Sequence, residues 1–505
     1  MSSLIRRYST VSNRLKESLH NQALLKTTAY INGQWVDAKS TFPVYDPGFY
    51  PKPEAKIAEV GSYTPEDFDN AVEAANDAFK LFKKTTGRQR AELLMKMYTL
   101  MKENQDDLAK MIVFENGKPY NDAFGEINYA ASFFQWFSEE AAHVTGDIIS
   151  SANSQNRILS IRQPIGVCGI LTPWNFPAAM ITRKLAAATS VGCTTVIKPA
   201  SETPLTALAL AQLAEEAGFP KGVVNVIPSE NSSEVGKALC EHPTVKKVSF
   251  TGSTNVGKIL MKQSASTLKK LSFELGGNAP FIVFEDVDVD NAVDGIIASK
   301  FRSSGQTCIC ANRIFVHEGI YDEVASKLVA KVKETTVLGH GLDKATTHGP
   351  VIHERSLAKV KEHVKDATSK GAELLLGGQV RPELGDYFHD LTILGNVTPE
   401  MDIFHEETFG PVCPLIKFSS DEEVLKLANN TDVGLAGYFY TKDVSRVFSV
   451  AEQLEVGMIG VNTGAISEAA LPFGGVKESG FGREGSKFGV DDYTIVKSLV
   501  VGGIA

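Results

Sequence analysis

The chain has 505 residues, of which 43% are hydrophobic and 22% are charged, and it carries a formal net charge of -9. One hydrophobic core rarely organises so many residues, so we expect two large domains, and the apolar content excludes extensive disorder. The negative charge excludes the concentrated basic surface that nucleic acids and acidic membranes require, so we expect a small-molecule partner, no nucleic acid and no membrane.

The N-terminal segment is basic. Arg6, Arg7, Arg14 and Lys16 fall within the first sixteen residues, where no acidic residue occurs. This composition is typical of a short mitochondrial presequence, but the frayed basic terminus of a cytosolic enzyme has the same composition. Residues 1–27 are therefore an N-terminal extension that is either a targeting segment or a frayed terminus. The location is the mitochondrial matrix or the cytoplasm, with a lean towards the first.

From about Thr64 to Asn153 the sequence has helical periodicity. Thr64 supplies an N-cap, Pro65 suits the first helical position, and acidic residues follow in the first turn. Apolar residues then recur at spacings of three and four as far as Phe82, which predicts an amphipathic helix.

From Ile165 onward, short apolar runs alternate with helical stretches. This alternation predicts a parallel sheet with helices on both faces, because parallel strands need long crossover connections. The predicted strands are Val167–Leu171, Thr194–Ile197, Val223–Ile227, Val248–Thr251 and Phe281–Phe284, and the predicted helices are Thr203–Ala217 and Asn255–Ser266.

A second alternating region extends from about Ala292 to Gly475. It contains a predicted strand at Arg313–His317 and predicted helices at Tyr321–Thr335 and Ser356–Gly371. No long linker separates the two regions, so we expect two packed α/β domains that share a cleft, and we expect the functional site in that cleft.

The six cysteines are too sparse for a disulfide framework, and neither a CxxC pair nor histidines at zinc spacing accompany them. We therefore expect a reducing compartment and no metal. Cys308 and Cys310 follow Gly305 closely, so one thiol is a candidate nucleophile, although a free cysteine is more often an inert buried residue.

Two further residue patterns carry chemistry. Glu274 ends a predicted strand and precedes Gly276 and Gly277, which let a ligand approach the backbone, so its carboxylate is a candidate general base. Asn175 lies between two prolines in Pro173–Pro177, which would hold its amide rigidly enough to donate to a developing oxyanion. Each pattern alone is as typical of a turn or a capped strand end.

Taken together, these motifs resemble the aldehyde dehydrogenase superfamily from about Tyr30 to Tyr493, and within it the succinate-semialdehyde dehydrogenases. The resemblance implies two doubly wound parallel-sheet, Rossmann-like domains plus a small oligomerisation β-extension, in an α/β fold. Other matching segments are Ile197–Ala200, Phe250–Ser253, Glu406–Pro411 and Pro472–Gly475. The implied domains are an NAD(P)-binding domain (28–141 and 162–276), a catalytic domain (277–475) and an oligomerisation arm (142–161 and 490–505) that gives dimers or tetramers.

The resemblance also implies roles for the three candidate residues. Cys308 would be the nucleophile, Asn175 would donate to the oxyanion beside the Cys308 backbone N–H, and Glu274 would be the base. An aldehyde has no leaving group, so its hydrogen leaves as hydride after the thiolate adds, and the resulting thioester then needs an activated water.

NADP or NAD is the implied cofactor, although no GxGxxG motif is present. Ser201 stands where family members that prefer NAD carry a glutamate, and a serine there does not repel the 2′-phosphate of NADP. Glu202 next to it leaves the preference open. The implied cofactor-binding residues are Thr172, Trp174, Lys198, Ser201, Gly252, Ser253, Glu407 and Phe409.

Arg183, Arg302 and Ser467 match the succinate-semialdehyde dehydrogenases, and two guanidiniums with a hydroxyl could bind the carboxylate tail of a semialdehyde. Ordinary ion-paired arginines are the alternative reading. Thr463 and Ala465 differ from the expected pocket residues, so glutarate semialdehyde stays a competitor of succinate semialdehyde.

Three other classes of protein fit the sequence less well. A cysteine hydrolase or thioesterase would need a histidine in a matching motif, which the sequence lacks. A CoA-acylating dehydrogenase would not need Glu274, and a non-catalytic relative would be expected to have lost the thiol or the carboxylate. Cys310 is either a small buried residue or a redox partner that forms a disulfide with Cys308.

Overall fold

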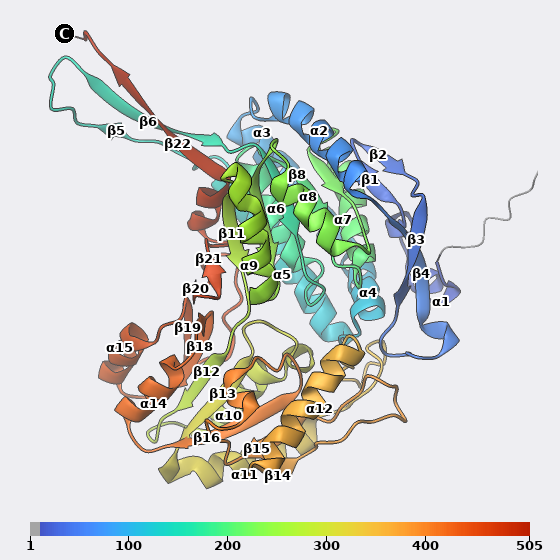
Figure 1. Cartoon of the computed structure of the whole chain (residues 1–505), viewed down its shortest axis with the longest axis vertical. Coiled ribbons are helices and arrows are strands. Elements are labelled where there is room, and N and C mark those ends of the chain that lie inside the picture. The colour runs from blue at the N-terminus through green and yellow to red at the C-terminus, as the bar shows by residue number, and fades with distance from the viewer. Residues whose placement is uncertain (1–10, 505) are drawn as a thin grey trace, which may run out of the picture.

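The computed structural model describes residues 11–504, which form two lobes and a β-arm that projects from one of them (Figure 1). The first lobe is built on an eight-stranded sheet in the order β2-β1-β9-β8-β7-β10-β11-β21. Its strands are β1 (Ala29–Ile31), β2 (Gln34–Val36), β7 (Val167–Leu171), β8 (Thr194–Lys198), β9 (Val224–Val226), β10 (Val245–Thr251), β11 (Lys270–Glu274) and β21 (Gly480–Phe481).

Helices cover both faces of this sheet. Along β7, Cys168 and Ile170 belong to the core shared with α3 to α7, whereas Val167 and Leu171 belong to the core shared with α2, α8 and α9. A strand buried on both faces is apolar throughout, which explains why the sequence shows it as a continuous run. The helices are α2 (Pro65–Phe82), α3 (Gly87–Glu103), α4 (Gln105–Asn116), α5 (Tyr120–Glu140), α6 (Ala179–Ser190), α7 (Pro204–Ala217), α8 (Ser232–Glu241) and α9 (Thr254–Ser264).

The second lobe repeats this design on a seven-stranded sheet in the order β14-β15-β16-β13-β12-β18-β19. Its strands are β12 (Ala279–Val283), β13 (Ala311–His317), β14 (Glu373–Leu376), β15 (Thr392–Gly395), β16 (Val412–Phe418), β18 (Ala436–Tyr440) and β19 (Met458–Val461). One face packs against α10 (Val289–Lys300) and α11 (Tyr321–Thr335), and the other against α12 (Glu354–Ser369), α13 (Asp402–His405), α14 (Asp421–Asn429) and α15 (Val444–Gln453).

The arm is a three-stranded antiparallel sheet of β5 (Ile148–Ile149), β6 (Arg157–Pro164) and β22 (Thr494–Val501). The strands β6 and β22 pair along their full length, from Thr494 with Pro164 to Val501 with Arg157. Several large apolar side chains of the arm are exposed, among them Ile148 at 84% and Val496 at 63%. An apolar edge of this kind is typical of a surface that another chain covers.

The N-terminal part is more structured than its composition indicates. Residues 1–10 of the predicted extension lie outside the described residues. The helix α1 (Asn13–Ser18) packs Leu15 into the core of the first lobe, and Arg14 pairs with the buried Asp46 at 3.1 Å. The short antiparallel pair β3 (Ser40–Tyr45) and β4 (Lys56–Ser62) follows.

Most predicted elements are confirmed, and so are the two doubly wound parallel sheets. Short antiparallel strands flank the parallel centres, with β2 and its neighbour β1 at one side of the first sheet, β21 at its other edge, and β14 at one edge of the second sheet. These edges are short and partly exposed, so they lack the continuous apolar run of a central strand. Between residues 11 and 504, no helix combines the length and apolarity needed to cross a membrane.

Candidate active site

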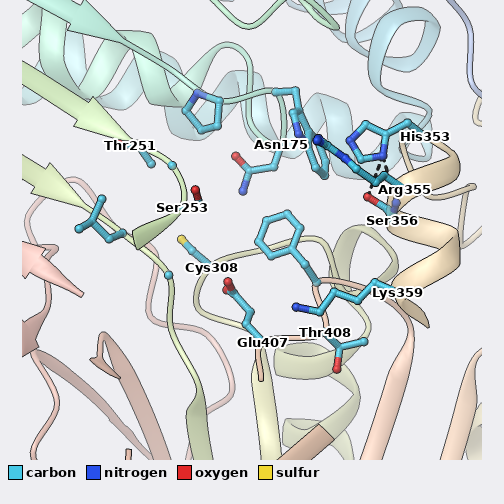
Figure 2. A pocket seen from close by; sticks show the side chains of 16 residues that line it. Asn175, Thr251, Ser253, Cys308, His353, Arg355, Ser356, Lys359, Glu407 and Thr408 are labelled. Atoms are coloured by element: carbon cyan, nitrogen blue, oxygen red, sulfur yellow. Dashed lines mark hydrogen bonds between the residues drawn. The ribbon is translucent and has the colours of Figure 1, made fainter. Parts of the chain in front are cut away.

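A cavity of about 380 Å³ lies where the two lobes meet. Its first wall comes from the carboxyl ends of the central strands of the first sheet, which the parallel register brings to one edge, as in the pairing of Thr251 with Glu274. The opposite wall contains Cys308, shortly before β13, and residues from α12. Figure 2 shows the Asn175 amide and the Cys308 thiol facing the same space.

The turn that carries Cys308 has an unusual backbone. Ser303 and Ser304 both have positive φ, at 48° and 54°, and Gly305 has φ of 77°. A Cβ at position 305 would collide with the carbonyl oxygen of Gly410, so only glycine fits there. The side chain of Gln306 anchors the turn, because its Oε1 accepts the Ile352 N–H at 2.9 Å.

The thiol of Cys308 is strongly influenced by burial. Burial raises the pKa of Cys308 to about 12, although the positive charge of Arg183 lowers it in part. The thiol is therefore neutral in the free protein at neutral pH, and a base or a nearby positive charge has to promote its deprotonation. Gly277 lies behind it, and a Cβ there would come within 2.8 Å of the Cys308 carbonyl oxygen.

The Asn175 amide is oriented by its neighbours. Its Oδ1 accepts the Phe176 N–H at 3.0 Å, which leaves Nδ2 as the end that can donate into the cavity. The buried Lys118 donates to the Asn175 carbonyl oxygen at 2.8 Å and to Glu126 at 2.6 Å. Glu126 in turn accepts the Ala178 N–H at 2.9 Å, so the whole loop is fixed by buried charge-assisted bonds.

Glu274 ends β11 and is 3% exposed. Within the described part of the chain, its Oε2 has no hydrogen-bond partner. Burial and then the charge of Glu484 raise the pKa of Glu274 well above its usual value, against the opposing effects of Arg183 and Lys184. A raised pKa makes this carboxylate a stronger proton acceptor than an ordinary glutamate, as a general base requires.

A buried ion cluster lies beside Glu274. Glu484 accepts hydrogen bonds from Arg183 and Lys184, and Lys184 also donates to Thr251, which lines the cavity. Burial alone would raise the pKa of Glu484, but the two cations lower it overall. The cluster thus favours the charged form of Glu484 and the protonated form of Glu274.

Five of the eight expected cofactor residues line the cavity, namely Trp174, Gly252, Ser253, Glu407 and Phe409. Ser253 is the N-cap of α9, so the positive end of this helix faces the space where a pyrophosphate would be stabilised. Trp174 and Phe409 meet edge to face with centroids 5.5 Å apart. Burial raises the pKa of Glu407 to about 7, and its carboxylate accepts the Gly277 N–H at 3.4 Å.

The other three expected cofactor residues lie outside this cavity. Lys198 donates to Ser232 at 2.5 Å, and burial lowers the pKa of Lys198 to about 8. Ser201 lines a second cavity of about 220 Å³ and donates to Glu202 at 3.2 Å. Thr172 is buried and donates its backbone N–H to the Lys198 carbonyl oxygen.

The expected substrate residues and Cys310 also lie outside the lining of the cavity. Arg183 is 1% exposed on α6, Arg302 stacks over the Phe176 ring at 5.1 Å, and Ser467 is partly buried in the loop after β19. Cys310 is a buried free thiol, and burial raises its pKa.

Several residues that build the site could not be predicted from the sequence. Arg355 and Lys359 have the i, i+4 spacing of one face of α12, which is the one local pattern that could have indicated them. The buried ion pairs of Arg183 and Lys184 with Glu484 join segments far apart in the sequence. The missed residues are Lys118, Glu126, Lys184, Arg355, Lys359 and Glu484.

Comparisons with known proteins agree with this geometry. The model of the aldehyde dehydrogenase family matches residues 35–499. The chain is 53% identical over 497 residues to the NADP(+) succinate-semialdehyde dehydrogenase of Saccharomyces cerevisiae, an alignment that covers 98% of this chain and 99% of the relative. It is 50% identical to the mitochondrial succinate-semialdehyde dehydrogenase of Homo sapiens, over 95% of this chain and 90% of that protein. The crystal structure of a succinate-semialdehyde dehydrogenase from Burkholderia pseudomallei superimposes with a TM-score of 0.94 at 49% identity, and covers 96% of this chain and 100% of that one.

Proposed function

The chain belongs to the aldehyde dehydrogenase family, and we propose that it oxidises succinate semialdehyde to succinate with NADP or NAD, as in 4-aminobutyrate degradation. One observation carries the choice of substrate. Within residues 11–504, Arg302 has no carboxylate within ion-pair distance, and the buried Nη2 of Arg183 has no carboxylate acceptor, with only the Tyr129 hydroxyl within reach. Donors left free in a buried site are best explained by an anionic ligand that satisfies them.

The first half of the reaction uses Cys308 and Asn175. The deprotonated thiol adds to the aldehyde carbon, and the Asn175 Nδ2 and the Cys308 backbone N–H donate to the oxygen that becomes negative. A nicotinamide cofactor held in this cavity would supply the hydride acceptor, and loss of the hydride would leave Cys308 as a thioester. Gly252, Ser253 and Glu407 fit the cofactor, because the α9 N-terminus, a glycine without a side chain and a buried carboxylate line the same cavity.

The second half uses Glu274. Its carboxylate takes a proton from a water that attacks the thioester, and the acid product leaves as the Cys308 thiolate reforms. Behind Glu274, Lys184 favours its charged carboxylate and Glu484 favours its protonated form, so the two residues set its pKa in opposite directions. His353 also lines the cavity, but its Nδ1 accepts the Ser356 N–H at 3.1 Å to cap α12, which argues against a cysteine hydrolase with this histidine as its base.

The adenosine end of the cofactor would lie near Lys198 and Ser201. A cation and a small hydroxyl suit a 2′-phosphate, so NADP should be accepted at least as well as NAD. Glu202 reduces this advantage because its carboxylate lies against Ser201.

Assembly, location and redox behaviour are parts of the same proposal. The arm of β5, β6 and β22 would join copies of the chain into a dimer or tetramer. The protein would act in the mitochondrial matrix or the cytoplasm, in line with the relatives named above. An oxidant such as hydrogen peroxide could take two electrons and two protons from Cys308 and Cys310 to form a disulfide; retained oxidant sensitivity in Cys310→Ala would reject this.

An absorbance assay tests the function. The purified protein should reduce NADP or NAD with succinate semialdehyde and form one succinate for each reduced cofactor, and Cys308→Ala should be inactive. Butanal is the matched substrate without a carboxylate, and glutarate semialdehyde is the longer competitor. Equal kcat/KM for butanal and succinate semialdehyde would contradict the proposed substrate.

A further inference from the structure

Two buried polar atoms near the ion cluster have only each other within reach. The Tyr129 hydroxyl on α5 and the Arg183 Nη2 on α6 are both inaccessible to solvent, and no other described residue offers either of them a hydrogen-bond partner. The hydroxyl oxygen can accept from the guanidinium, but the hydroxyl proton then has no acceptor, and a buried donor without an acceptor is costly. Such a pair points to a ligand.

The surroundings fix both groups in place. The Tyr129 ring contacts the Phe133 ring at 4.9 Å, and the Arg183 guanidinium lies over the Phe473 ring at 4.2 Å. Of the Arg183 nitrogens, only Nε donates to Glu484, so the Nη2 end of the guanidinium is not used in this ion pair. Neither side chain can turn away to find a partner elsewhere without breaking these contacts.

The Tyr129 hydroxyl lies within electrostatic range of both arginines. Burial raises the pKa of Tyr129, while the positive charge of Arg183, its hydrogen bond to the hydroxyl and the charge of Arg302 oppose that rise. The hydroxyl therefore keeps its proton at neutral pH and can act as a neutral donor. Arg183 in turn acts on the pKa of Cys308, so the group lies within electrostatic range of the reacting sulfur.

We propose that the Tyr129 hydroxyl donates a hydrogen bond to the anionic tail of the substrate, as a third donor beside Arg183 and Arg302. A carboxylate has two oxygens that can accept several bonds, so it can satisfy the Arg183 Nη2, the Arg302 guanidinium and the Tyr129 hydroxyl at once. Tyr129 thus becomes a specificity-determining residue for aldehydes with an acidic tail. The inference rests on the proposed function.

The experiment compares wild type and Tyr129→Phe with succinate semialdehyde and with butanal. We expect the KM for succinate semialdehyde to rise about tenfold with kcat nearly unchanged, since the lost bond is remote from the reacting carbon. The kinetics with butanal should stay the same. Tyr493→Phe is the matched control, because it also removes a buried hydroxyl without a partner in residues 11–504, and it should leave both substrates unaffected.

A second variant separates the hydroxyl from the ring. Tyr129→Met fills similar space without a hydroxyl and should lose the same preference, so poor folding of one variant does not decide the outcome. An unchanged preference in either folded variant, or an equal loss with both substrates, overturns the role of Tyr129. If wild type itself does not prefer succinate semialdehyde, the proposed function fails instead.

Discussion

The loop that carries Asn175 and the cluster of Tyr129, Arg183 and Arg302 are both largely buried, yet they differ in how their polar atoms are satisfied. In the loop, Lys118 and Glu126 supply buried charge-assisted bonds that fix the backbone. In the cluster, the Tyr129 hydroxyl and the Arg183 Nη2 have only each other within reach in the part of the chain that the structure describes. This difference fits our proposal, in which the reacting centre is built in advance and a ligand completes the tail-binding region.

Removing the support of the loop should have the largest effect. Glu126→Gln leaves the Lys118 charge buried without a countercharge, which costs about 3–5 kcal/mol of stability. It also loosens the Asn175 amide, so kcat should fall about 100-fold with succinate semialdehyde and butanal alike. Thermal unfolding and steady-state kinetics measure the two effects.

The control for this variant is Glu115→Gln. Glu115 is also fully buried, but it accepts the Leu205 and Thr206 N–H groups at the start of α7 instead of supporting the Asn175 loop. It should lower stability and leave kcat within about threefold. A loss of kcat as large as in Glu126→Gln would mean that the loop has no special role.

Removing a donor from the cluster should affect only the acidic substrate. For Arg302→Ala we expect kcat/KM with succinate semialdehyde to fall about 30-fold, as for a lost bond between charged groups, with butanal unchanged. Arg302→Lys should recover part of the loss because it restores the charge without the planar fork. A preference for succinate semialdehyde that survives Arg302→Ala would show that the tail binds elsewhere.

The reacting centre should also respond to pH. Burial raises the pKa values of both Cys308 and Glu274, and each group acts in its deprotonated form. Activity therefore increases as pH rises and protons leave. Because this range lies well below the Cys308 pKa of about 12, kcat/KM should grow about 100-fold between about pH 6 and about pH 8. A profile that falls over this range would contradict the assignment of either group.

The smallest effect on activity should come from a change at the adenosine end of the proposed cofactor site. Ser201→Glu adds a carboxylate that repels a 2′-phosphate, so kcat/KM for NADP should fall about fivefold while that for NAD stays constant. The change is modest because Glu202 already places a carboxylate there. Equal loss with both cofactors would remove Ser201 from the phosphate site.

Local patterns allowed much of this molecule to be predicted from its sequence. Central strands such as β7 were readable because burial on both faces makes them continuous apolar runs, and α2 because Thr64 and Pro65 mark its start. The short antiparallel strands at the sheet edges could not be predicted, since two to four residues carry too little periodicity.

Some residues of the site could likewise be predicted from local motifs, and others could not. Cys308, Glu274 and Asn175 lie in short motifs, so the sequence could single them out. The bond between Arg183 and Glu484 joins residues 301 positions apart, and nothing local in the sequence indicates such a contact. Lys118 and Glu126 also act on a loop that is distant in sequence, so only the folded arrangement reveals their role.

The most direct test of the central claim is to trap the acyl group on Cys308. Glu274→Gln, mixed with succinate semialdehyde and NADP and quenched in acid, should release one equivalent of reduced cofactor and carry one succinyl group on Cys308 by peptide mass spectrometry. The same experiment with Cys308→Ala should give neither. A burst of reduced cofactor without an adduct on Cys308, or an adduct on another residue, would contradict the account.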